Sequence, residues 1–102
     1  MATSVLTGSV AATGVAINLS IGFVPEYVKV INVTDGLVIY EWFNTMADGT
    51  AIRTDLAVGP QAANGISKYL GTSALAPGFT LGTAIALAGK TLAWLASRDS
   101  TS

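Results

Sequence analysis

The sequence predicts an all-β fold: a small antiparallel β-sandwich or jelly-roll-like domain with an extended N-terminal arm. Short segments rich in β-branched and aromatic residues alternate apolar with polar side chains, as half-buried strands do. Turn-forming pairs such as Asp48-Gly49 and Asn64-Gly65 separate these segments. A chain of 102 residues has room for one core. We therefore expect an arm or edge strand over 1–14, a sandwich domain over 15–98 and a polar tail over 99–102.

The first half of the chain carries the clearest strand patterns. Apolar residues occupy every second position from Val15 to Ile21, which is typical of a half-buried strand. Pro25 removes a backbone donor and predicts a corner. Thr34-Asp35-Gly36 predicts a tight turn that joins two strands in a hairpin. The strands expected in this half are Val5–Val10, which is the weakest pattern, Val15–Ile21, Tyr27–Val33 and Leu37–Phe43.

The second half is less regular. Asn64-Gly65 predicts a hairpin turn, the preceding stretch 59–64 reads as irregular, and 71–77 reads as a loop. The alanine-rich stretch 83–97 leaves two alternatives open. Its propensity favours a helix, whereas its glycines and the strands upstream favour β-structure, which we prefer. The expected strands are Ala51–Leu56, Ile66–Leu70, Phe79–Leu81, Thr83–Leu87 and Thr91–Arg98.

The composition argues against an enzyme and against cofactor or metal binding. The chain has no cysteine and no histidine, which excludes thiolate nucleophiles, disulfides and Cys/His metal sites. Its five basic residues are too scattered for nucleic-acid binding. The segment Ala84–Thr91 approaches a phosphate-binding loop, but it is apolar and too few residues follow it. Glycines and prolines interrupt the uncharged stretches, so we expect no membrane partner.

The segment Leu37–Phe43 is apolar on both faces, which predicts a strand that lies between layers or at an interface. Only 11% of the residues are charged, and mean hydropathy is +0.58, so further burial between subunits of a dimer or trimer is expected. We expect the Val38-Tyr40-Trp42 side, or the Leu92-Trp94 side, to be buried between subunits. Glu41 reads either as an acid at a sheet edge or as the ion-pair partner of Arg53 or Arg98, within or between subunits. The predicted interface residues are Tyr40, Glu41, Trp42, Phe43, Leu92 and Trp94.

The run Gly22–Val30 fits the pattern "GF-x-P-x-YV-x-V". Together with several shorter runs, it resembles small structural proteins of tailed bacteriophages. The others are Glu41-Trp42, Met46–Ala51, Asn64–Ile66, Gly78–Gly82 and Lys90–Trp94. The nearest functional type is the capsid decoration, or cement, protein. The resemblance implies a virion protein on the capsid surface that binds the major capsid protein and stabilises the shell.

Two other functions remain open at this point. A recognition module of a tail fibre or spike would bind carbohydrate or a receptor through an exposed Tyr40 or Trp42 platform. A small membrane-active lysis protein is the third reading.

Overall fold

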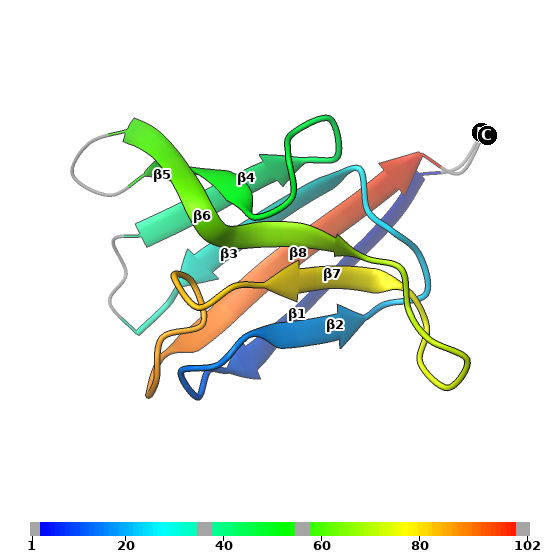
Figure 1. The fold of residues 1–102 in the computed structure, drawn as a ribbon, viewed down its shortest axis with the longest axis horizontal. Coiled ribbons are helices and arrows are strands. Elements are labelled where there is room, and N and C mark those ends of the chain that lie inside the picture. The colour runs from blue at the N-terminus through cyan, green and yellow to red at the C-terminus, as the bar shows by residue number, and fades with distance from the viewer. Residues whose placement is uncertain (1–2, 35–37, 55–57, 100–102) are drawn as a thin grey trace.

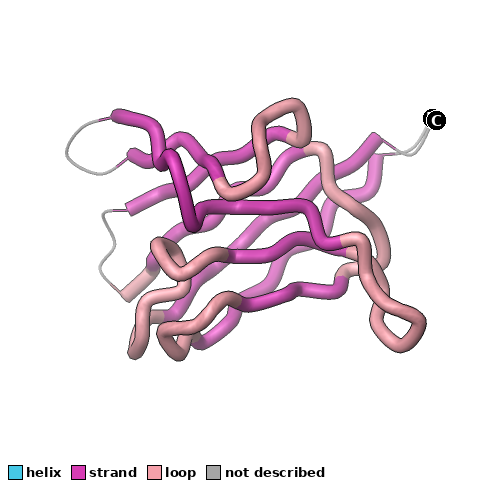
Figure 2. Tube along the Cα trace, in the orientation of Figure 1, coloured by secondary structure: helices cyan, strands magenta, loops and turns pink. Residues whose placement is uncertain are grey.

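The computed structural model describes residues 3–34, 38–54 and 58–99, and within them it contains strands and no helix (Figures 1 and 2). All strand pairs are antiparallel, in one sheet of order β1-β8-β3-β4-β5-β6-β7-β2. The all-β prediction is confirmed. The strands are β1 Thr3–Ala11, β2 Ile17–Ser20, β3 Tyr27–Asn32, β4 Val38–Phe43, β5 Thr50–Thr54, β6 Val58–Tyr69, β7 Gly78–Leu81 and β8 Thr91–Asp99.

The sheet curls into two layers. Strands β1, β8, β3 and β4 form one layer, and β2, β7 and the second half of β6 form the other, while β5 and the start of β6 connect them at one end (Figure 1). Strands β1 and β2 stand at the two ends of the strand order, so the sheet remains open between them. Two free edges therefore remain, one long and one short.

Strand β6 serves both layers because it bends in its middle. Its residues 58–61 pair with β5, its residues 66–69 pair with β7, and Ile66 also pairs with Thr50 of β5. At the bend Asn64 has a φ of +57°, in the left-handed region that asparagine tolerates. A Cβ on Gly65 would lie 2.8 Å from the Thr50 carbonyl oxygen, so the close approach of β5 requires glycine. The predicted hairpin at Asn64-Gly65 and the irregular stretch 59–64 were therefore wrong.

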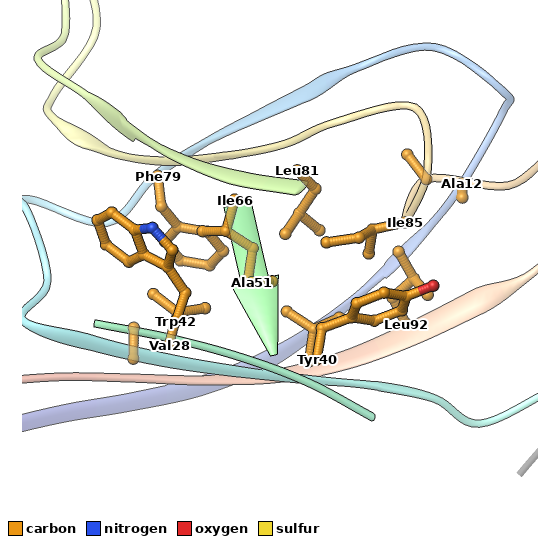
Figure 3. Packing of buried hydrophobic residues seen from close by; sticks show 13 residues of the cluster. Ala12, Val28, Tyr40, Trp42, Ala51, Ile66, Phe79, Leu81, Ile85 and Leu92 are labelled. Atoms are coloured by element: carbon orange, nitrogen blue, oxygen red, sulfur yellow. The ribbon is translucent and has the colours of Figure 1, made fainter. Parts of the chain in front are cut away.

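The core lies between the two layers (Figure 3). Trp42 from β4 meets Ile66 and Phe79 from the opposite layer, and all three are fully buried. At the other end of the core, Tyr40 lies near Leu92 and Ile85. The other buried members of this cluster are Ala12, Val28, Val30, Ala51, Leu81, Ala86 and Ala96.

The segment after β7 is a turn that closes one end of the core. The amides of Ile85 and Ala86 both donate to the Gly82 carbonyl, and both side chains are buried. The predicted strand Thr83–Leu87 was wrong, and so was a helix over 83–97, because Thr91–Asp99 forms β8. The apolar residues of this turn fill one end of the core between the two layers. In the sequence, such a run of apolar residues resembles a strand.

The N-terminal segment belongs to the sheet. Strand β1 pairs with β8 over its whole length, from Thr3 opposite Asp99 to Ala11 opposite Thr91. Of the two expectations for this region, edge strand and extended arm, the described part is an edge strand. The turn residues Asp35 and Gly36 and the tail 100–102 lie outside the described residues.

Candidate interaction surface

The side of β4 that was expected to lie between subunits, that of Tyr40 and Trp42, faces the core of the single chain. Tyr40 and Trp42 point into the core, with 4% and 0% of their surface exposed, and Leu92 is at 0%. These three are core residues of the single chain, which corrects their assignment to an interface. Trp94 is partly buried, and its ring lies 5.5 Å from that of Phe79. Phe43 remains 49% exposed on the opposite face.

The opposite face runs across five strands, β1, β8, β3, β4 and β5, and we call it the outer face. Directly opposed residues in an antiparallel sheet share a face, so the strand registers arrange its side chains in three rows. The rows are Val5, Ser97, Tyr27 and Phe43; Thr7, Leu95, Lys29, Glu41 and Ile52; and Ser9, Ala93, Ile31, Ile39 and Thr54. Seven of these fourteen side chains are apolar, four are serine or threonine, and the other three are Tyr27, Lys29 and Glu41.

A shallow groove of about 590 Å³ crosses this surface over β1, β8 and β3. It is lined by Lys29, Ile31 and Leu95 together with Thr7, Gly8, Ser9, Ala93 and Trp94. Leu95 and Ile31 were not among the predicted interface residues. Periodicity shows which residues share a face within one strand. Placing Leu95 and Ile31 on the same face as Phe43 also requires the strand order β8-β3-β4, which the sequence does not give.

Glu41 lies in the middle of the outer face, and both of its predicted roles within the chain are wrong. Strand β4 lies between β3 and β5, so Glu41 is not at an edge. Arg53 pairs with Tyr40, which points to the other face, and the guanidinium of Arg98 lies 4.8 Å above the Phe23 ring. Glu41 instead accepts a 2.7 Å hydrogen bond from the Tyr27 hydroxyl and lies opposite Lys29.

Tyr27 connects the charged centre of the face to its apolar end. Its ring centroid is 5.0 Å from that of Phe43. Burial raises the pKa of its hydroxyl to about 12, and the hydrogen bond to Glu41 and the negative charge of that carboxylate act in the same direction. The proton is therefore held on the phenol, and the Tyr27–Glu41 contact is maintained at neutral pH.

The described residues contain no cluster of three or more potential metal ligands. In the segment Ala84–Thr91, which approached a phosphate-binding pattern, Ala88 and Gly89 form a turn with Gly89 at a φ of +78°, and Thr91 begins β8. A phosphate loop instead requires a strand before it and a helix after it. Across the part of the chain that is described, no helix is long and apolar enough to span a membrane.

Comparison of this chain with protein-family models, with curated proteins and with solved structures finds no match.

Proposed function

We propose that this chain is a non-enzymatic virion structural protein that binds the outer surface of a bacteriophage capsid and stabilises it. The observation that carries the proposal is the outer face, three rows across five strands in which seven of the fourteen side chains are apolar and two are charged. Soluble monomers rarely expose a large contiguous apolar patch, so such a patch supports docking onto another protein. The resemblance of Gly22–Val30 to phage structural proteins supports the major capsid protein as that partner.

The construction of this face suits permanent attachment better than catalysis or reversible signalling. Side chains on paired strands are already restricted, so little conformational entropy is lost on binding. Lys29 and Glu41 lie opposite each other, which leaves the face close to neutral. A neutral, preordered surface with many apolar side chains suits an obligate interface.

The structure gives no support to carbohydrate recognition through Tyr40 or Trp42, the aromatic residues that suggested it. That reading needed Tyr40 or Trp42 at the surface, and both lie inside the core. On the outer face Phe43 has no polar group to orient a sugar, and the Tyr27 hydroxyl beside it donates its hydrogen bond to Glu41.

Occupancy on purified particles tests the proposal. Phe43→Asp places a charge on the outer face, and we expect it to lower occupancy at least tenfold, since burying a phenylalanine is worth about 1.5–3 kcal/mol. Leu70→Asp is the matched control, because Leu70 is 78% exposed at the end of β6 in the other layer. Both variants should unfold at temperatures close to that of the wild type.

Imaging should show the wild-type protein in many copies over the shell. Particles without it should assemble but release their DNA at lower temperature, because binding only the assembled state stabilises that state. A few copies at the tail, equal heat resistance without the protein, or equal occupancy of the two variants would each contradict the proposal.

A further inference from the structure

Strand β1 is a long free edge that lacks the usual protection against pairing. Edge strands of soluble proteins are commonly blunted by lysines, prolines, bulges or shortness. Strand β1 has 9 residues, no charged residue and no proline, and it pairs with β8 without a register shift. Val5 and Leu6 on it are 51% and 41% exposed. The other edge, β2, has only 4 residues and is a much poorer template.

The backbone groups that face outward can be assigned from the hydrogen bonds next to β1. The Ala12 amide donates to the Lys90 carbonyl at 2.8 Å, so Ala12 points towards the β8 side. Backbone groups alternate in direction along a strand, so Val10, Gly8 and Leu6 also point towards β8. The Val33 amide donates to the Thr91 carbonyl, so the backbone groups of odd-numbered β8 residues point towards β3. Those of even-numbered β8 residues point towards β1, which agrees with the assignment for β1. The β1 residues whose backbone amide and carbonyl groups point away from β8, towards the free edge, are Thr3, Val5, Thr7, Ser9 and Ala11.

We propose that β1 pairs antiparallel with β1 of a second copy of this chain, about a two-fold axis at Thr7. In this register Thr7 faces the partner's Thr7, and Val5 faces the partner's Ser9. Every outward-pointing residue then meets another outward-pointing residue, so the hydrogen-bond pattern is self-matching. The strand is uncharged, so no like charges oppose each other across the axis.

The side chains on the inner side of β1 are also self-complementary. Leu6 falls opposite the partner's Gly8, which has no side chain. Within one chain the Trp94 indole lies so close to Gly8 that a Cβ there would be 2.7 Å from Trp94 Cζ2. The half-exposed Leu6 therefore covers Gly8 and reaches the edge of the indole beside it. This match favours a second copy over an unrelated extended segment.

Pairing of this kind keeps both outer faces on the same side of one continuous sheet. Thr7 and Ser9 line the groove next to β1, so the grooves of the two copies meet across the axis. The dimer does not depend on what the outer face binds, and its test needs the purified protein alone.

Sedimentation velocity on the full chain tests the dimer, which we expect to predominate at about 10 µM. The double variant V5K/S9K places lysine opposite lysine twice across the axis and should weaken association roughly tenfold. The matched variant V5E/S9K places glutamate opposite lysine and should restore the dimer. Both positions are exposed in the single chain, so folding should be unchanged by circular dichroism. A folded wild-type monomer, or equal dissociation of both double variants, would overturn the proposal.

Cysteine cross-linking tests the register, and the natural absence of cysteine makes each introduced thiol unambiguous. Thr7→Cys should form an intermolecular disulfide under mild oxidation, because residues opposed in a sheet lie within about 5.5 Å. Ser9→Cys alone should not, because the two positions are offset by four residues, or about 13 Å. A mixture of V5C and S9C chains should form the mixed disulfide. Equal cross-linking of T7C and S9C, or none by T7C, overturns this register.

Discussion

Tyr27 makes the outer face sensitive to high pH. Its pKa is raised from 10.0 to about 12 in the folded protein, chiefly by burial and also by Glu41. A group whose folded pKa is raised stabilises the fold below its unfolded pKa, and this stabilisation is lost as pH rises through the folded value. The contribution of Tyr27 is therefore complete below pH 10 and falls between pH 10 and 12.

We expect the wild type to lose stability over this range relative to Tyr27→Phe, which cannot ionise. Thermal unfolding of the two proteins at matched pH measures the difference, and other titrating groups cancel in the comparison. Glu41→Gln keeps an acceptor but removes the charge, so it should lower the pKa of Tyr27, measured by NMR at the ring Cζ. Ionisation of wild-type Tyr27 near pH 10 would contradict this account.

Gly8 is the residue on which the packing of Trp94 depends. A Cβ at this position would lie 2.7 Å from the indole, well inside ordinary contact. Gly8→Ala should therefore destabilise the protein by about 1–3 kcal/mol, the usual effect of overpacking. Gly59→Ala is the control, because a Cβ at Gly59 meets no atom within 4 Å, and it should change stability by less than about 0.5 kcal/mol. Urea unfolding measures both, and equal stability would show that the indole is not fixed over β1.

At the scale of elements, the bend in β6 allows one strand to belong to two layers. Asn64 holds the left-handed conformation there, at a φ of +57°. Asn64→Ala should destabilise the fold by about 1 kcal/mol, because alanine lacks the local hydrogen bonding that favours this region, whereas Asn64→Gly should be neutral or stabilising. Chemical denaturation ranks the three proteins. A stable Asn64→Ala would mean that the bend does not need the left-handed residue.

Most strands could be predicted from the sequence, because alternation of apolar and polar residues is a local property. Tyr27–Asn32 and Gly78–Leu81 lie within one residue of expectation. The misses have non-local causes. The bend at Asn64 resembles a hairpin turn in sequence, and only the pairing of β6 with both β5 and β7 distinguishes the two. The turn over 83–89 resembles a strand because it fills one end of the core.

Which face of β4 lies inside could not be predicted, because both faces are apolar and period-two alternation does not choose between them. The choice is made by Phe79 and Ile66, which come from the opposite layer and are distant in sequence. They give the inner position to the large indole of Trp42, which leaves Phe43 outside. Of the predicted interface residues, Phe43 and Glu41 therefore lie on the outer face, whereas Tyr40, Trp42 and Leu92 lie in the core.

At the scale of the whole molecule, the low charge of the chain determines how its outer face should respond to salt. The protein has five basic and six acidic residues, and Lys29 and Glu41 lie opposite each other on the face itself. Apolar contacts are not screened by ions, whereas contacts that depend on exposed charges weaken steeply with ionic strength. The proposed attachment to capsids should therefore be governed by the apolar side chains of the outer face.

We expect the affinity for particles stripped of the protein to change by less than about threefold between 0.1 M and 1 M salt. Refilling such particles with purified protein at each ionic strength, and counting bound copies, measures it. Lys29→Ala is the informative variant, because it leaves the Glu41 charge without its cross-strand neighbour and should make binding depend on salt. Wild-type occupancy that collapses at 1 M salt would mean that charge, and not the apolar outer face, holds the protein on the shell.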